Sequence, residues 1–198
     1  MRKVGDSVRK LKTGCVHIYT GDGKGKTTAS LGLGLRAAAS GLRVCMFQFL
    51  KSKGCSVENW LEFPGFRVIC LDQEHPMFQK LKVKSQPALA SVRGGAGKSE
   101  IKLKNNILKE MAKVRRIMKS KKYDLIILDE LINCLSEGFV EEKYVLGLIK
   151  ARPKAVEMVL TGRRAPTAII AAADYVTDMR KVKHPFDNGL QCREGIEY

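Results

Sequence analysis

The feature that most constrains this chain is a glycine-rich loop between an apolar run and a helix-forming stretch. Residues 15–19 read Cys-Val-His-Ile-Tyr, and residues 27–39 favour a helix. In such a strand–loop–helix order, backbone N–H groups and the positive end of the helix dipole turn toward one point, which suits phosphate. Lys26 would add a full charge, and the Thr27 hydroxyl would bind a magnesium ion that also touches the phosphates. We therefore predict a nucleoside triphosphate site made by nine consecutive residues: Thr20, Gly21, Asp22, Gly23, Lys24, Gly25, Lys26, Thr27 and Thr28.

The loop departs from the common phosphate-binding pattern at one position. That pattern is a glycine, four residues, then Gly-Lys-Ser/Thr, but here Thr20 occupies the first position and Gly21 follows it. A second stretch, residues 94–99 (Gly-Gly-Ala-Gly-Lys-Ser), imitates the motif, with Val92 in place of its first glycine. No apolar strand leads into this second stretch, so nothing would hold it at a sheet edge. We expect it to be a mobile, basic loop over the active site.

Apolar runs and helix-forming stretches alternate along the chain, which predicts an α/β fold with a mostly parallel sheet and helices on both faces. The 198 residues suffice for one domain, expected at 14–198 after a basic N-terminal arm at 1–13. Residues 72–99 show no clear element and are expected to form an irregular active-site loop region. The expected strands are 15–20, 43–50, 66–71, 123–129, 156–161 and 174–179, and the expected helices are 26–39, 100–119, 141–150 and 166–173.

Composition narrows the class of protein. The net charge of +16 raises the possibility of nucleic-acid binding, but the basic residues are dispersed and aromatic residues make up 7% of the chain. Nothing in it suggests a base-stacking platform, so nucleic acid is not the partner we expect. The chain lacks an apolar run of about 18 residues and a signal-peptide pattern, which predicts no membrane span and a cytoplasmic protein. Six cysteines without a Cys-x-x-Cys pair predict neither a zinc site nor a disulfide framework.

A second motif lies at residues 123–130, where an apolar strand ends in Asp129 and Glu130. In phosphate-loop proteins an acid at the end of such a strand faces the magnesium shell. We expect this strand to neighbour the strand before the loop. One of the two carboxylates should reach the metal or its water, while the other fixes a neighbouring group. Together the two motifs predict a P-loop nucleotide protein and leave the reaction open.

The final third of the chain carries a family resemblance. It contains Thr-Gly-Arg at 161–163, Val-Lys-His-Pro-Phe at 182–186 and Gly-Ile-Glu-Tyr at 195–198. With the loop and Leu-Asp-Glu-Leu at 128–131, this ordered set resembles the ATP:corrinoid adenosyltransferases of the cobalamin-assimilation type. The resemblance covers residues 14–198 except roughly 72–100.

The resemblance implies a homodimeric enzyme of cobalamin biosynthesis with a RecA-like P-loop fold. Such an enzyme transfers the 5′-deoxyadenosyl group of ATP to the cobalt(I) of a reduced corrinoid and releases triphosphate, making adenosylcobalamin or its precursor. The family holds ATP in reverse along its loop, which agrees with the shifted glycine. The implied electron donor is a reduced flavoprotein, and a basic surface would suit its docking.

The resemblance also implies roles for individual residues. Lys24, Lys26 and the loop amides would carry the triphosphate charge, while Thr27 and Glu130 would hold Mg²⁺ with Asp129 nearby. The implied catalytic residues are Lys26, Arg36 and Arg163; the alternative for each arginine is a surface or helix-facing charge, and Arg163 has the stronger case for a function.

On the corrinoid side, the family often shows Phe-x-Trp in the loop after the third strand, where this chain has none. Met77 and Phe78 are the best substitutes there, and His184 is a further candidate for contact with the corrinoid. His17, inside an apolar strand, is expected to be a satisfied core residue.

Other functions fit part of the pattern. A nucleic-acid-stimulated P-loop ATPase agrees with the charge and the loop, and it would release phosphate from the terminal position of ATP. A small-molecule kinase lacks a second-substrate signature in this chain. A non-catalytic corrinoid-binding relative stays open because the 72–78 loop diverges.

Overall fold

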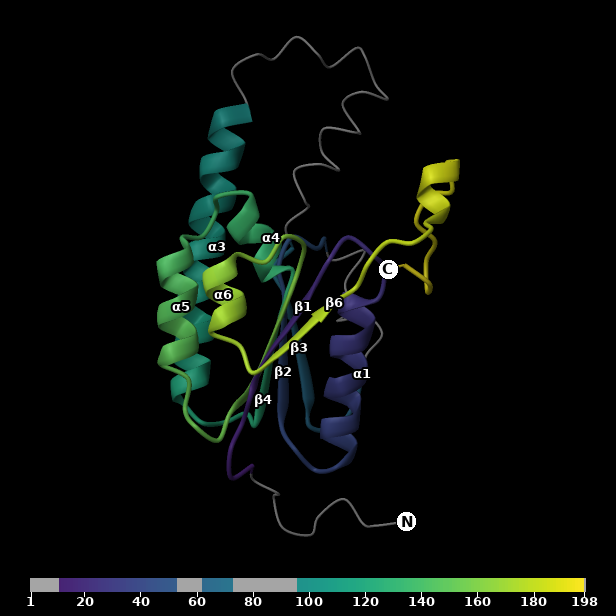
Figure 1. Ribbon diagram of the computed structural model, residues 1–198. Helices are drawn as coiled ribbons and strands as arrows, with labels where there is room; N and C mark the ends of the chain where they lie inside the picture. Colours follow the sequence, from purple (N-terminus) through teal and green to yellow (C-terminus); the bar gives the residue numbers. More distant parts are fainter. Residues whose placement is uncertain (1–10, 53–61, 73–95, 198) are drawn as a thin grey trace.

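The chain forms a six-stranded parallel sheet (Figure 1). The computed structural model describes residues 11–52, 62–72 and 96–197. The order across the sheet is β3-β2-β4-β5-β1-β6, and all six predicted strands are confirmed. They are β1 (Val16–Thr20), β2 (Val44–Gln48), β3 (Phe66–Cys70), β4 (Leu125–Asp129), β5 (Glu157–Thr161) and β6 (Tyr175–Asp178).

Helices cover both faces of this sheet, as predicted. The helix α1 (Lys26–Ala39) lies on one face, and α3 (Ala96–Lys119), α5 (Glu142–Lys150) and α6 (Thr167–Ala171) lie on the other (Figure 1). Two short elements were not predicted, α4 (Leu131–Ser136) and the 3₁₀ helix η4 (Pro185–Asn188). Both are too short to produce an apolar period that a sequence pattern could reveal.

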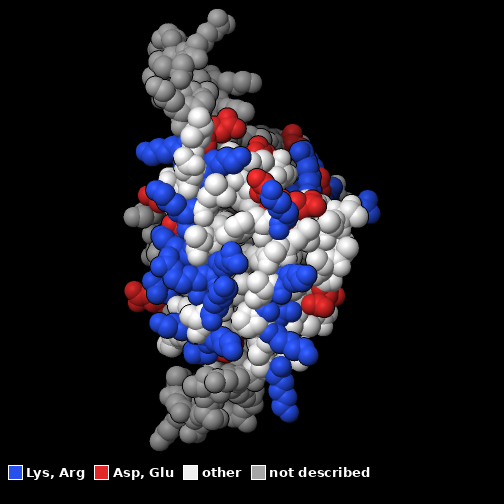
Figure 2. Space-filling model, turned by 90° about the vertical axis from the view of Figure 1, so that its left-hand side faces the viewer, with Lys and Arg blue, Asp and Glu red and all other residues white. Residues whose placement is uncertain are grey.

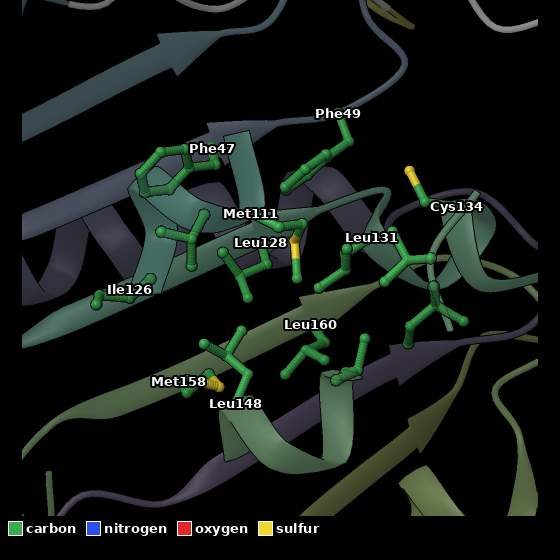
Figure 3. Packing of buried hydrophobic residues seen from close by; sticks show 14 of the residues in the cluster. Phe47, Phe49, Met111, Ile126, Leu128, Leu131, Cys134, Leu148, Met158 and Leu160 are labelled. Carbon is green, nitrogen blue, oxygen red and sulfur yellow. The ribbon is translucent and has the colours of Figure 1, made fainter. Parts of the chain in front are cut away.

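The central strands β2, β4 and β5 are buried on both faces because their alternate side chains enter two different cores. Ile126 and Leu128 of β4 pack toward α3 and α5, in the larger core drawn in Figure 3. Leu125 and Ile127 pack toward α1 with Phe66. This two-sided burial explains why the strands read as continuous apolar runs.

One expectation about strand order is wrong. We expected β4, which ends in Asp129 and Glu130, to neighbour β1, but β5 lies between them. The crossover that follows each strand decides its place in the sheet, and an apolar run carries no information about its neighbours. The carboxyl ends of β1, β5 and β4 still lie at the same edge because the strands are parallel.

The expected loop at residues 72–99 ends earlier in the structure than we predicted. Residues 96–99 form the first turn of α3, so the imitation motif at 94–99 ends inside a helix. Our prediction began this helix at residue 100 because its apolar period starts at Ile101. Residues 73–95 and residues 1–10 of the expected arm lie outside the described residues.

β6 forms an edge of the sheet, and its four residues are exposed. At this edge His17 stacks on Tyr175 with ring centroids 4.6 Å apart. His17 Nε2 lies 2.5 Å from Glu157 Oε1. We expected His17 to be a satisfied core residue; its ring is satisfied by Glu157, but it is only partly buried and lies beside the edge strand β6 and not in the core.

Basic side chains are dispersed over the face made by α3 and α5, which Figure 2 shows. Four of them follow helical spacing along α3, namely Lys102, Lys109, Lys113 and Arg116. Among the described residues, none of the helices combines the length and the apolar character that a bilayer crossing requires.

Two glycines of α1 should respond in opposite ways to alanine. A Cβ at Gly34 would lie 2.6 Å from the buried Phe66 ring and 3.1 Å from Ile127, whereas a Cβ at Gly32 meets nothing within 4 Å. We expect Gly34→Ala to lower the free energy of unfolding by about 1–3 kcal/mol through overpacking. Gly32→Ala should raise it by about 0.5–1 kcal/mol through helix propensity. Urea unfolding of both variants tests this, and equal stability of the two would contradict the packing of α1.

Candidate functional site

The glycine-rich loop lies at the carboxyl edge of the sheet, between β1 and α1. Gly21 and Gly25 have φ of 96° and 117°, conformations that suit glycine. The loop packs closely on the chain that leaves β6, since Gly23 N donates to Met179 O at 2.7 Å. A Cβ at Gly21 would come within 2.3 Å of Asp178 Oδ1, and one at Gly23 within 2.6 Å of Met179 O. These glycines are therefore required by close backbone approach.

Lys26 begins α1 and is buried under this loop. Its Nζ donates to Gly21 O at 2.8 Å and to Gly23 O at 2.7 Å. Burial lowers the pKa of Lys26, and the positive charge of Arg163 lowers it further. The ammonium group thus holds the loop curved at the positive end of the helix, where a phosphate group would be favoured.

Asp129 connects the loop helix to the second motif. Its buried carboxylate accepts from Thr27 Oγ1 at 2.9 Å and from Thr161 Oγ1 at 2.7 Å on Oδ1. Its other oxygen accepts from Gln48 Nε2 at 3.2 Å. The end of β4 is therefore tied to α1 and β5 and to the end of β2.

Glu130 follows Asp129 in the left-handed conformation, with φ of 65°. Its backbone N–H donates to Thr161 Oγ1 at 2.9 Å, and its carboxylate accepts from Asn133 Nδ2. Burial, with the neighbouring Asp129 charge, raises the pKa of Glu130 to about 7. The two acids of the motif therefore differ in environment, since the Asp129 carboxylate has three hydrogen-bond donors.

Arg163 lies in the loop after β5, where its backbone N–H donates to Asn133 Oδ1 at 2.6 Å. Its charge lowers the pKa of both Lys26 and Glu130. The backbone of Arg163 is therefore joined to Glu130 through Asn133, while its exposed guanidinium acts on Lys26 and Glu130 through its charge.

Two charged side chains of the loop, Asp22 and Lys24, contact the C-terminal segment. Asp22 Oδ1 accepts from Lys181 N at 3.1 Å, which is the main reason that the pKa of Asp22 is lowered. Lys24 Nζ lies 3.1 Å from Glu197 Oε1, and Arg193 contacts the same carboxylate. Thr28 is exposed on the first turn of α1.

Other candidates are not brought to this cluster. Arg36 is exposed in the last turn of α1, roughly 15 Å along the helix from Lys26 at 1.5 Å per residue. His184 caps η4, its Nδ1 accepting from Phe186 N at 3.2 Å. Met77 and Phe78 lie outside the described residues.

Sequence reasoning missed three residues of this cluster. Thr161 ends the predicted strand at 156–161, and a polar residue at the carboxyl end of a buried strand could have indicated it. Gln48 ends β2 in the structure, two residues before the predicted end of that strand at residue 50. Asn133 lies in the unpredicted helix α4, and its position depends on how that helix meets the β5 loop.

The donor set suits a magnesium ion. Thr27 offers a hydroxyl and Asp129 and Glu130 offer carboxylates, all of them oxygen ligands of the kind that Mg²⁺ prefers. Among the described residues no group of three or more His, Cys, Asp or Glu side chains could hold a metal by itself. Mg²⁺ usually keeps several waters and takes other ligands from substrate phosphates, so one or two protein carboxylates suffice to hold it.

The chain is similar to proteins of one family. The model of ATP:corrinoid adenosyltransferase BtuR/CobO/CobP matches residues 12–198. A corrinoid adenosyltransferase of Pseudomonas aeruginosa is 30% identical over 93% of this chain and 84% of its own length. Corrinoid adenosyltransferase CobA of Salmonella typhimurium is 29% identical over 93% and 86%, respectively.

A solved structure shares the fold. The flagellar accessory protein FlaH of Methanocaldococcus jannaschii has a TM-score of 0.50 with 10% sequence identity, over 88% of this chain and 74% of that one. At this identity the likeness concerns the α/β P-loop fold alone.

Removing the Thr161 hydroxyl should destabilise the protein. Thr161→Val leaves the shape nearly unchanged but deprives buried Asp129 of a donor and Glu130 N of its acceptor. We expect a loss of about 1–3 kcal/mol in the free energy of unfolding. Thr177→Val on exposed β6 is the matched control. Equal effects of the two substitutions in urea unfolding would exclude the hydroxyl bridge.

The raised pKa of Glu130 predicts a pH dependence of stability without metal. The carboxyl is protonated in both states below its ordinary value of 4.5, and the folded state resists ionisation up to about 7. Its stabilising contribution is therefore present below pH 4.5 and is lost as pH rises through 7. Glu130→Gln should become more stable than wild type by about 1–3 kcal/mol at pH 8 relative to pH 5. Urea unfolding with a chelator measures this, and a difference that does not change with pH would contradict it; Glu137→Gln, on an exposed residue, is the control.

Proposed function

The chain belongs to the BtuR/CobO/CobP family of ATP:corrinoid adenosyltransferases, and from this premise we propose how its site performs the reaction of that family. The protein transfers the adenosyl group of ATP to a corrinoid. The observation that carries this conclusion is the family match over residues 12–198, which includes both the loop and the acidic motif.

The transfer places an unusual demand on a phosphate loop. The electron pair of cobalt(I) in the reduced corrinoid forms a bond to C5′ of ATP, and the C5′–O bond breaks with its electrons leaving on the triphosphate. The corrinoid itself is the nucleophile, so the protein must orient two large substrates and stabilise the charge on the leaving group. An intact triphosphate is the product, and hydrolysis of the terminal phosphate would waste the substrate.

We assign the triphosphate to the loop at residues 20–28. Its amides lie at the positive end of α1, and Lys26 is already aimed at the loop carbonyls Gly21 O and Gly23 O. Lys26 and Arg163 would balance the charge that develops on the leaving oxygen. Lys24 would join them by exchanging its contact with Glu197 for a phosphate.

We assign Mg²⁺ to Thr27 and Glu130, with Asp129 orienting the Thr27 hydroxyl. When bound, the ion supplies positive charge to the phosphate oxygens. The catalytic role of Arg36 remains a prediction, since Arg36 lies away from the loop of its own chain.

The corrinoid and the reduced flavoprotein donor complete the proposal. His184, with Met77 and Phe78, is the candidate contact for the corrinoid. The basic face over α3 and α5 in Figure 2 would attract an acidic flavoprotein. We also propose a cytoplasmic location, where such a donor and ATP are both present.

We propose that the active enzyme is a homodimer. Support comes from exposed apolar side chains on and after β6, including Tyr175 at 56% and Val176 at 43%. Phe186, Leu190 and Ile196 of the C-terminal segment are exposed as well. A second copy that covers the β6 edge would remove these side chains from water.

Adenosyl transfer can be tested by mixing the protein with MgATP and chemically reduced cobalamin without oxygen. We expect loss of the cobalt(I) absorbance, a light-sensitive alkylcobalamin and intact triphosphate. Lys26→Met should lower kcat by about 10²–10³-fold, because the positive charge that stabilises the triphosphate leaving group is lost. Lys150→Ala, at the far end of α5, is the matched control.

Two results would contradict the proposal. Orthophosphate release that depends on added nucleic acid, with the cobalt(I) spectrum unchanged, would favour the nucleic-acid-stimulated ATPase. Equal kcat for Lys26→Met and Lys150→Ala would exclude the loop lysine from the reaction.

A further inference from the structure

We propose that Asn133 is a positioning residue that holds Glu130 and Arg163 in place beside the phosphate loop. This inference rests on the proposed function of the site, and it adds a residue that neither motif contains. Asn133 touches no reacting atom. Its side chain instead joins the two parts of the site that come from different crossovers, the acidic motif after β4 and the arginine loop after β5.

Both polar ends of the Asn133 amide are used. Nδ2 donates to Glu130 Oε2, and Oδ1 accepts from Arg163 N at 2.6 Å. An amide is the group that offers a donor and an acceptor side by side on a planar end. Aspartate would keep the acceptor and lose the donor, and alanine would lose both.

The two segments that Asn133 joins are also in close backbone contact. Gly162 precedes Arg163 with φ of 144°, and a Cβ there would lie 2.7 Å from Asn133 N and 2.8 Å from Ile132 Cβ. Gly162 N donates in turn to Tyr19 O at 3.2 Å, at the end of β1. The arginine loop is therefore pressed between α4 and the strand that carries the phosphate loop.

This arrangement matters because Glu130 and Arg163 would act on the same triphosphate from two sides. Small displacements of charged groups weaken stabilisation of a leaving group considerably. Thr161 fixes the backbone of Glu130 through the Glu130 N contact at 2.9 Å. Asn133 then fixes the Glu130 carboxylate and the Arg163 backbone, neither of which Thr161 reaches.

The test compares Asn133→Ala and Asn133→Asp with Ser136→Ala. Ser136 lies on the same short helix, and its hydroxyl donates only to backbone carbonyls within that helix, Ile132 O at 3.1 Å and Asn133 O at 3.3 Å. For each variant, kcat, KM for ATP and KM for cobalamin are measured, together with the Mg²⁺ concentration for half-maximal activity. Calorimetric affinity for MgATP without corrinoid is the second readout.

We expect Asn133→Ala to lose about 10- to 100-fold in kcat/KM for ATP, the usual effect of removing a hydrogen bond to a charged group. KM for cobalamin should stay within about twofold, because the amide contacts Glu130 and Arg163, which the proposed function assigns to the triphosphate and its metal. Asn133→Asp keeps the acceptor for Arg163 N, so its kcat/KM for ATP should fall less. Its Mg²⁺ dependence should still change, because a carboxylate then faces Glu130.

The outcomes separate this inference from the proposed function. Kinetic constants and MgATP affinity of both Asn133 variants equal to those of Ser136→Ala would overturn the positioning role. If Asn133→Ala does not fold, Asn133→Asp decides by the same comparison. If wild type transfers no adenosyl group, the proposed function fails, and the MgATP affinities alone then support or overturn the role of Asn133.

Discussion

The buried carboxylate of Asp129 is the interaction on which the site depends. It accepts hydrogen bonds from Thr27, Thr161 and Gln48, which lie on α1, β5 and β2. A buried carboxylate is costly unless its oxygens are satisfied, so these donors cannot move independently. The phosphate loop, the arginine loop and the acidic motif are thereby held at one edge of the sheet, although β5 separates the two strands that carry the main motifs.

Tight backbone packing adds a second constraint around the loop. Gly21 and Gly23 lie against the chain after β6, with no room for a Cβ, and Asp22 and Lys24 reach residues farther along that segment. The chain after β6 therefore packs directly against the loop, which gives a physical reason for the sequence motif that contains Glu197. Most residues of 182–197 are exposed and add little to the core.

Several parts of the fold and site could be predicted because local patterns determine them. The six strands and four longer helices followed from apolar runs and from the helical period of α3. The loop at 20–28 followed from its glycines and the lysine at its end. The neighbour of β4 was predicted wrongly, the short helix α4 was not predicted, and the start of α3 was placed too late, after Ala96. None of these three features leaves a local pattern in the sequence. Thr161 and Asn133 were missed because their roles depend on partners about 30 residues away, Asp129 and Glu130 for Thr161 and Arg163 for Asn133.

The sequence by itself predicted the chemistry of the groups that are present, a loop suited to phosphate and two carboxylates suited to a metal ion, and it determined the family to which the chain belongs. These depend on residue type and on spacing over a few positions, which a chain carries without being folded. Only the tertiary structure decided which carboxylate is held by three donors and which has its pKa raised to about 7. It also decided that the backbone of Arg163 is joined to Glu130 through Asn133, whereas Arg36 lies in the last turn of α1, away from the loop. Burial and proximity set these properties, and both arise only when crossovers bring distant segments to one edge of the sheet.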